Sequence, residues 1–280
     1  MLTQAEIIAN TKRLDGRCPI HGLPMMQLNI PVKIAGEDEP RKPSPVCPKC
    51  AKEQRDKKEE ELVKESLKNN LYLRTYDVLM RDSTIPEELK SASFDNFVVK
   101  TTQEKQMLDF AKAQTQKYLN GFEGNTLLTG TTGVGKTHLT VAMAKSLNET
   151  YKDKGNPKSV LFVNLTEILR KVRESFKYES KESYYSRMLI EADYLFLDDL
   201  GVKLGNSGQS KSAWEEEFIF DVLSHRKSTI VTTNLSNNEI ANLYSERVAS
   251  RVRTGLEGNV FRAVDIEDKR YKINQLTAKG

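Results

Sequence analysis

Short apolar runs in the second half of the chain predict the buried strands of a sheet. They cover residues 126–128, 160–163, 194–197 and 228–233, and a last strand is predicted over 259–266. Residues 194–197 are apolar without alternation, which is typical of a parallel strand covered on both faces. We therefore expect a sheet buried inside the protein.

Apolar residues at helical spacing lie between these runs. The first run is followed by Leu139, Val141, Ala142, Met143 and Leu147, and further helices are predicted over 101–119 and 165–178. Strands that alternate with helices through short connections specify a doubly wound parallel sheet of the α/β class. The fold class predicted for this part of the chain is therefore α/β.

The N-terminal third has a different pattern. Residues 25–34 alternate well enough for short strands, and 37–45 form a polar, proline-rich loop. Residues 51–70 carry charges of alternating sign and predict a solvated helix, whose few apolar residues either face water or form a narrow seam against a partner. We therefore predict a small domain over 1–50, a helical linker over 51–92 and the main domain over 93–280.

The most informative motif is Gly-Thr-Thr-Gly-Val-Gly-Lys-Thr-His at residues 130–138. It completes the spacing G-x-x-x-x-G-K-[ST], lies between a predicted strand and a predicted helix, and is typical of a loop whose backbone N–H groups surround a polyphosphate. Lys136 is expected to reach the β- and γ-phosphates, and the Thr137 hydroxyl to bind Mg²⁺. The expected nucleotide-binding residues are Gly130, Thr131, Thr132, Gly133, Val134, Gly135, Lys136, Thr137 and His138.

Polar residues end two of the predicted strands. Asp198 and Asp199 follow the run 194–197, and Asn234 follows the run 228–233. The carboxyl ends of parallel strands meet at the edge where such sheets bind ligands. We expect Asp198 to hold Mg²⁺ and Asp199 to orient or deprotonate the attacking water. Asn234 either contacts that water or the γ-phosphate, or it is a turn or helix-capping residue.

Several arginines lie on a short predicted helix over residues 245–253. The guanidinium group is planar, permanently charged and able to bind phosphate through two hydrogen bonds. An arginine that acts across a subunit boundary would make hydrolysis depend on self-association. A surface helix with ion pairs has the same sequence pattern, so the pattern alone leaves both interpretations open.

Composition narrows the class of protein. The chain has 280 residues, a net charge of only +4, 38% hydrophobic and 29% charged residues. Binding of nucleic acid would therefore depend on local basic patches. No apolar run approaches the length of a membrane span, and the N-terminus has no signal-peptide core, so the cytoplasm is the expected compartment and no membrane partner is expected.

The cysteines predict a metal site. All 3 fall in two short pairs, Cys18-Pro-Ile-His21 and Cys47-Pro-Lys-Cys50. An odd number of cysteines in a cytosolic protein argues against a disulfide framework. Cys18, His21, Cys47 and Cys50 would complete a tetrahedral zinc site with no open position, which stabilises a domain too small for a large core. The competing interpretation is three reduced thiols and a surface histidine.

These residues together resemble the bacterial replicative helicase loaders of the DnaC/DnaI type, which belong to the AAA+ ATPases. The resemblance covers most of the chain and depends on motifs at residues 92–97, 133–139, 197–201, 232–235 and 246–252. The zinc module ahead of the ATPase is similar to the DnaI branch, in which the N-terminal domain engages the helicase. The implied fold is an AAA+ P-loop ATPase core preceded by a small zinc-binding domain.

The resemblance also implies roles for single residues. Residues 130–137 match the Walker A motif, Asp198 and Asp199 the Walker B motif, and Asn234 the sensor 1 position. Arg251 matches the arginine finger, with Arg247 as the alternative, and Arg270 falls near the sensor 2 arginine. Asp199 stands where AAA+ proteins usually carry glutamate. Its shorter arm predicts slow hydrolysis, which suits a switch better than a motor.

The function implied is an ATP-dependent loader that places a hexameric replicative DNA helicase on single-stranded DNA, with ATP or ADP, Mg²⁺ and Zn²⁺ as cofactors. Candidate DNA contacts are the segments 177–187, with Tyr178, Tyr184 and Tyr185, and 201–214, with Lys203, Lys211, Ser212 and Trp214. For these segments, the alternative is that Trp214 belongs to the core and that the Gly/Ser-rich loop is a solvated insertion. The alternative is a transposition helper ATPase of the IstB-like type that acts on duplex DNA. An interaction protein with bound nucleotide is disfavoured by the intact lysine, acid pair and arginines.

Overall fold

The computed structural model describes residues 3–33, 39–175, 180–201, 213–264 and 266–269. Backbone contacts divide the chain into two compact units, Met1–Asn70 and Leu71–Gly280. Each unit is described by itself below. The three-part division at residues 50 and 92 stays a prediction.

The first unit is built on a hairpin and a helix. The described elements are α1 (Gln4–Ala9), β1 (Thr11–Arg17), β2 (Pro24–Leu28) and α2 (Pro48–Arg74), whose last residues belong to the second unit. Strands β1 and β2 pair antiparallel from Thr11 opposite Leu28 to Arg17 opposite Pro24. The sequence predicted β2 and the helix but not β1, because β1 is mostly charged and exposed and carries no apolar alternation.

The second unit contains a five-stranded sheet in the order β4-β5-β6-β3-β7, and every pairing within it is parallel. The strands are β3 (Thr126–Gly130), β4 (Val160–Asn164), β5 (Tyr194–Leu200), β6 (Thr229–Thr233) and β7 (Val260–Ala263). All the predicted strands are therefore confirmed, although the last ends at Ala263 instead of residue 266. Because β6 lies between β3 and β5, the ends of these strands are adjacent in space.

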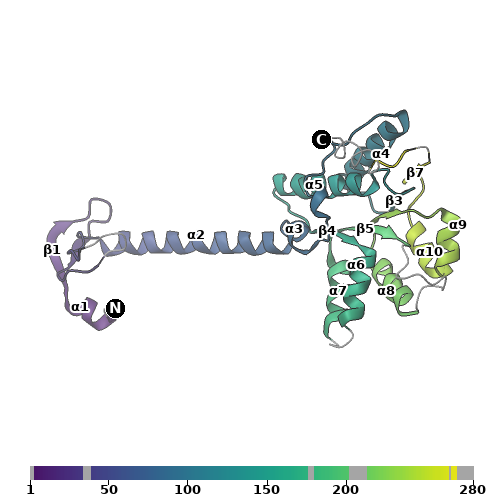
Figure 1. The fold of residues 1–280 in the computed structure, drawn as a ribbon. Coiled ribbons are helices and arrows are strands. Elements are labelled where there is room, and N and C mark those ends of the chain that lie inside the picture. The colour runs from purple at the N-terminus through teal and green to yellow at the C-terminus, as the bar shows by residue number, and fades with distance from the viewer. Residues whose placement is uncertain (1–2, 34–38, 176–179, 202–212, 265, 270–280) are drawn as a thin grey trace. The chain divides into compact units, whose positions relative to one another are not determined.

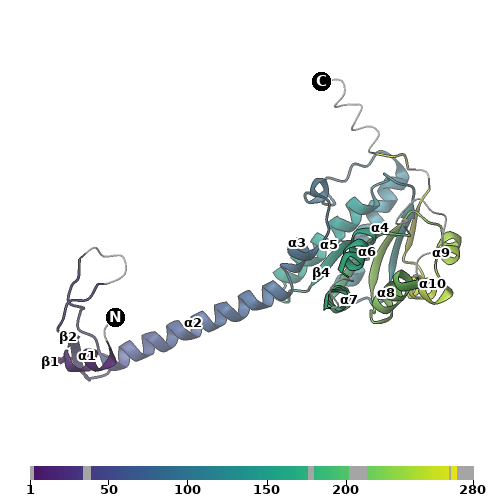
Figure 2. The same cartoon turned by 60° about the horizontal axis from the view of Figure 1, so that its bottom comes forward.

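Helices cover both faces of the sheet (Figure 1). The described helices are α3 (Val78–Asp82), the 3₁₀ helix η1 (Glu87–Leu89), α4 (Thr102–Leu119), α5 (Lys136–Asp153), α6 (Leu165–Ser175), α7 (Ser180–Glu191), α8 (Ala213–Ser224), α9 (Asn237–Leu243) and α10 (Glu246–Arg253). Helices α8, α9 and α10 lie side by side (Figure 2). The predicted helix over 165–178 is observed as α6, and residues 176–179 lie outside the described part.

Alternate residues of each strand supply two separate cores. Leu195 and Leu197 pack in the core that contains α6, α7, α8 and α10, whereas Phe196 packs in the core with α4 and α5. Leu127 and Leu128 divide between the same two cores. Burial of both strand faces is the reason why these strands are apolar throughout. The doubly wound α/β prediction is confirmed.

A bulge lies at the end of β5. Leu197 pairs with Val231 and Leu200 with Thr233, so Asp198 and Asp199 together face the single residue Thr232. Asp199 adopts φ of 60°, the only positive φ among the described residues other than glycine. An extra residue in one strand changes the direction of the side chains that follow it. The bulge therefore allows two consecutive acids to serve the same edge of the sheet.

Candidate nucleotide and metal sites

The phosphate loop connects the buried strand β3 to the first turn of α5, as its sequence predicted. Gly135 has φ of 98°, and a Cβ atom there would lie 2.7 Å from a ring carbon of Phe97, so only glycine fits. Lys136 Nζ donates to the carbonyl oxygens of Gly130 at 2.8 Å and Thr131 at 2.9 Å. The ammonium group is thus held inside the curve of the loop, where phosphate oxygens are expected.

Asn234 joins this arrangement from the end of β6. Its Oδ1 accepts a hydrogen bond of 2.6 Å from Lys136 Nζ. The capping residue of the next helix is Ser236, which forms a capping box with Glu239. Asn234 therefore faces the phosphate loop, and a different residue caps α9.

Asp198 and Thr137 form the candidate magnesium site. Thr137 Oγ1 donates to both carboxylate oxygens of Asp198 at 3.2 Å, and Thr232 Oγ1 donates to Asp198 Oδ1 at 2.6 Å. Burial of Asp198, followed by the charge of Asp199, raises the pKa of Asp198 to about 6. Neighbouring oxygen ligands of octahedral Mg²⁺ lie about 3 Å apart, because each bond is about 2.1 Å. The two residues therefore fit a magnesium ion that would also stabilise the carboxylate charge.

Asp199 is held by the strands on either side of β5. Its N–H donates to Thr232 Oγ1 at 3.0 Å, and its Oδ2 accepts a hydrogen bond of 3.3 Å from Asn164 Nδ2. Asn164 ends β4 and pairs in register with Asp198. Sequence reasoning missed Asn164 and Thr232, although both are polar residues near the ends of predicted strands.

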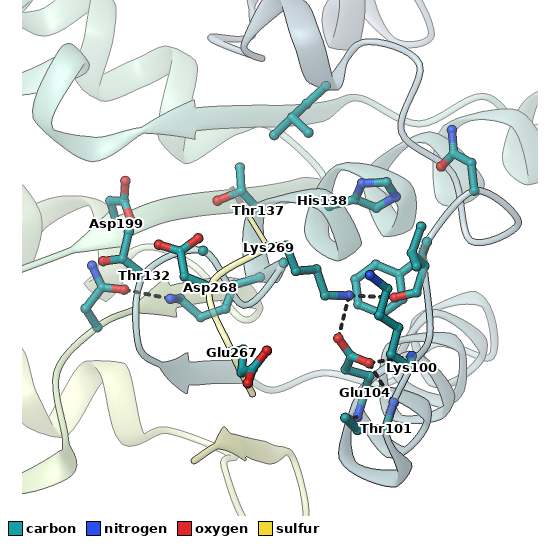
Figure 3. A pocket seen from close by; sticks show the side chains of 18 residues that line it. Lys100, Thr101, Glu104, Thr132, Thr137, His138, Asp199, Glu267, Asp268 and Lys269 are labelled. Atoms are coloured by element: carbon teal, nitrogen blue, oxygen red, sulfur yellow. Dashed lines mark hydrogen bonds and ion pairs between the residues drawn. The ribbon is translucent and has the colours of Figure 1, made fainter. Parts of the chain in front are cut away.

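A cavity of about 720 Å³ opens over the loop (Figure 3). Its lining includes the predicted residues Thr132, Gly133, Gly135, Lys136, Thr137, His138, Asp199 and Asn234. Of the other loop residues, Val134 is buried in the core. His138 lies edge-on to the ring of Phe97 at 5.4 Å, and its Nε2 is 3.0 Å from the carbonyl oxygen of Ser93. We call the part of the cavity near Lys136 the phosphate half.

The other half of the cavity was not predicted. We call it the aromatic half; it is lined by Phe97, Val98, Lys100, Glu104 and Lys269. The motif at residues 92–97 contains Phe97, but no local pattern connects it to Glu104 on α4 or to Lys269 after β7. Phe97 and Glu104 are close in the chain, and tertiary packing brings Lys269 to both.

Arg247 and Arg251 lie on α10 and do not line this cavity in the described chain. Arg247 pairs with Glu217, and its guanidinium lies 4.5 Å from the centre of the Phe220 ring. Arg251 lies 5.9 Å from the same ring and is exposed. The third predicted arginine, Arg270, lies outside the described residues.

The four predicted metal ligands come together in the first unit. The Sγ atom of Cys18 lies 3.8 Å from His21 Nδ1 and 3.6 Å from Cys50 Sγ, and Cys47 Sγ lies 3.7 Å from His21 Nδ1. Ligands on a tetrahedron with zinc–sulfur bonds of 2.3 Å are about 3.8 Å apart, so the donor set fits Zn²⁺. The second ring nitrogen of His21 lies 3.2 Å from a Glu53 carboxylate oxygen, which fixes the orientation of the ring.

The local backbone favours a thiolate at the first ligand. The N–H groups of His21 and Ile20 donate toward the Cys18 sulfur and lower the pKa of Cys18 to about 6. The turn is closed by a hydrogen bond of 2.8 Å from Gly22 N to Cys18 O. Cys18 and Cys47 are buried. The four side chains therefore form a candidate metal site.

The candidate DNA contacts are partly outside the described chain. Residues 177–179 and 202–212, with Lys203, Lys211 and Ser212, are not described. Trp214 packs against the core and lies 5.7 Å from the Arg173 guanidinium, which favours a structural role. Tyr184 on α7 is 57% exposed, and Tyr185 packs against the core. Among the described aromatic residues of these two segments, Tyr184 is the exposed one, while Tyr178 lies outside the described residues.

The parallel sheet, the phosphate loop and the acid pair define the class: a P-loop nucleotide-binding protein of the AAA+ type. The chain belongs to the family of IstB-like ATP binding proteins, which it matches over residues 53–252.

Named relatives agree with this class. The replicative helicase loader DnaC of Escherichia coli (strain K12) is 29% identical over 174 residues, which cover 59% of this chain and 64% of DnaC. The match therefore spans less than two thirds of that relative. The DnaC of Buchnera aphidicola subsp. Schizaphis graminum is 27% identical over 195 residues, 68% of this chain and 74% of that protein.

The crystal structure of a DnaC helicase loader has the same fold. It superposes with a TM-score of 0.50 at 24% identity and covers 65% of this chain and 100% of that chain.

Among the helices that the structure describes, none has both the length and the apolar character needed to cross a bilayer.

Proposed function

We propose that this protein is an ATP-dependent loader that binds a hexameric replicative DNA helicase and helps place it on single-stranded DNA. The observation that carries the proposal is the similarity to the DnaC loaders. The family match over residues 53–252 includes the phosphate loop, the acid pair and Asn234. The Cys/His cluster supports a loader further, because it belongs to a separate N-terminal unit that is available for a protein partner.

The phosphate half of the cavity supports binding and hydrolysis of ATP. Lys136 exchanges its bonds to the loop carbonyls for the β- and γ-phosphates, and Asn234 holds the γ-phosphate or the attacking water. Thr137 and Asp198 would hold Mg²⁺, which would neutralise charge at the phosphates. Asp199 orients and deprotonates the water. The base and ribose then extend toward the aromatic half.

Hydrolysis requires a second chain in this proposal. Arg251 is exposed on α10 and absent from the lining of the chain's own cavity, which is the geometry expected of a residue that completes a neighbouring site. Arg247 is the weaker candidate, because its charge is paired with Glu217. Arg270 is proposed as the sensor 2 arginine on the resemblance alone.

The Cys/His cluster is proposed to hold a structural zinc ion that stabilises the helicase-binding unit. With all four ligand atoms within 4.8 Å of one another, the ion would cross-link the β1–β2 turn to the start of α2. The unit buries few apolar side chains, so the metal supplies much of its folding free energy.

Native mass spectrometry of the full chain mixed with the replicative helicase of the same organism tests the loader proposal. We expect a complex with one helicase hexamer that changes in stability or stoichiometry with ATP in the wild type and in Lys154→Ala, an exposed lysine next to α5. Lys136→Ala is expected to lose the response to ATP. Absence of any complex would contradict the loader function.

The match to the IstB-like family supports a second candidate function, a transposition helper ATPase that acts on duplex DNA. The same preparation therefore also receives duplex DNA and, separately, single-stranded DNA. ATP-dependent binding to duplex DNA without binding to the helicase would favour the helper. Binding to helicase and single-stranded DNA would favour the loader.

A further inference from the structure

Lys269 lies in the aromatic half of the nucleotide cavity, although it follows β7 at the far end of the chain. Its Nζ is 3.8 Å from the centre of the Phe97 ring and donates to the backbone oxygen of Val98 at 2.6 Å. The same atom is 3.0 Å from Glu104 Oε1. Figure 3 shows the ammonium group pointing toward Glu104. The Lys269 ammonium group thus contacts the face of one aromatic ring and two hydrogen-bond acceptors.

The acceptors are fixed independently of Lys269. The Glu104 side chain is 5% exposed and accepts hydrogen bonds from the backbone N–H groups of Lys100 and Thr101 in the capping box of α4. Burial opposes ionisation of Glu104, but these N–H groups and the Lys269 ammonium outweigh it and lower the pKa of Glu104. If Lys269 moved away, the Phe97 ring would lose its cation, and the Val98 carbonyl oxygen and Glu104 Oε1 would lose the donor that Lys269 provides.

We propose that the Lys269 side chain and adenine compete for one position in the cavity, so that a bound base displaces Lys269. The inference rests on the proposed ATP-binding function and assigns this segment its role in that site. A planar base stacks on an aromatic ring, and the 6-amino group of adenine donates two hydrogen bonds. Adenine thus replaces both the ring contact and the donor that Lys269 provides. Guanine carries an oxygen at that position, which would face two acceptors.

The displaced segment also touches the phosphate loop. The Lys269 N–H donates to Gly133 O at 3.0 Å, and the Asp268 carboxylate lies so close to Gly133 that a Cβ atom there would be 1.8 Å from Asp268 Oδ1. A carboxylate at this place opposes a polyphosphate, because like charges at short range repel. Displacement of Lys269 by the base therefore frees both halves of the cavity in one movement.

Lys269→Met tests the proposal, since methionine keeps an apolar stem for Phe97 and removes the donor. We expect calorimetry to show ADP binding about tenfold tighter than in the wild type, the order of one charge-assisted hydrogen bond. Pyrophosphate has no base to take the place of the Lys269 side chain, so its gain is expected to be smaller than that of ADP. GDP is expected to bind more weakly than ADP to both proteins, because its 6-oxygen would face two acceptors. Lys112→Met, a lysine 5.9 Å from the Phe94 ring in a separate pocket, is the matched control with unchanged binding.

A second substitution changes the affinity in the opposite direction. Lys269→Arg retains the charge and offers more donors to Glu104 and Val98, so ADP is expected to bind more weakly than to the wild type. Equal or weaker ADP binding by a folded Lys269→Met protein would overturn the inference, as would parallel gains for ADP and pyrophosphate. If the wild type binds pyrophosphate and Mg²⁺ but no ADP, the inference fails while a phosphate site remains. If it binds none of them, the proposed function fails as well.

Discussion

Asn164→Ser separates two roles that one side chain performs at the end of β4. Asn164 Nδ2 donates to Asp199 Oδ2 at 3.3 Å, and Asn164 Oδ1 accepts the Glu167 N–H at 3.1 Å in the first turn of α6. Serine is also a favourable helix cap, but its hydroxyl is too short to reach Asp199. The substitution therefore removes the contact with the proposed catalytic base and keeps the start of α6.

The magnitude follows from the geometry of the contact. A hydrogen bond to a charged group contributes about 1.5–3 kcal/mol. A separation of 3.3 Å is beyond the usual range for N–H···O bonds, so the lower end of that range applies. A loss of about 1.4 kcal/mol in positioning Asp199 corresponds to a tenfold lower rate of hydrolysis. ADP affinity is expected to stay unchanged, because Asn164 does not line the cavity.

Single-turnover hydrolysis of Mg²⁺-ATP, with ADP binding measured on the same samples, checks this expectation. Asn164→Asp is the matched control: it preserves the capping oxygen but places a second negative charge beside Asp199, and we expect a larger loss of rate. A wild-type rate in Asn164→Ser would refute the positioning role. A faster rate would mean that Asn164 holds the carboxylate away from the water.

Three further pairs of substitutions test other parts of the chain. Thr232→Val removes the hydroxyl that forms hydrogen bonds with both Asp198 and Asp199, and we expect it to lower the free energy of unfolding, measured in urea, by about 2 kcal/mol. Thr229→Val on the same strand is the control. It is expected to leave the free energy of unfolding unchanged, because Thr229 Oγ1 has no hydrogen-bond partner among the described residues. Cys47→Ser is expected to reduce the zinc content in elemental analysis from one ion per chain to none. Glu53→Gln is expected to retain zinc but to bind it about tenfold more weakly. A full zinc content in Cys47→Ser would exclude the proposed ligand set. Arg251→Ala is expected to abolish ATP hydrolysis, and a mixture of this protein with Lys136→Ala protein is expected to hydrolyse ATP again. Arg247→Ala is expected to retain most of the activity. If the mixture stays inactive while the chains still associate, Arg251 does not act in trans.

The sequence by itself predicted the residues that form the phosphate half of the cavity. Glycines at fixed spacing, Lys136 and Thr137 lie on one continuous loop between a strand and a helix, so local chemistry specifies them. The acids and Asn234 each end an apolar run, and parallel strands bring their carboxyl ends to one edge. The four candidate metal ligands were also predicted from the sequence, because they fall in two pairs with short spacing, Cys18 with His21 and Cys47 with Cys50.

Only the tertiary structure decided how these groups are oriented. The bulge that turns Asp199 depends on Thr232 in the neighbouring strand, and its partner Asn164 comes from the strand on the other side. The arrangement depends on the order of strands in the sheet, which no local pattern in the chain encodes.

The aromatic half of the cavity shows the same limit more strongly. Lys269 is distant in sequence from Phe97 and Glu104, and no motif links it to them. A lone lysine, a helix-capping glutamate and a core phenylalanine are each ordinary in sequence. Their joint role arises because the chain after β7 returns over the phosphate loop, and a long-range contact of this kind is fixed by packing of the whole domain.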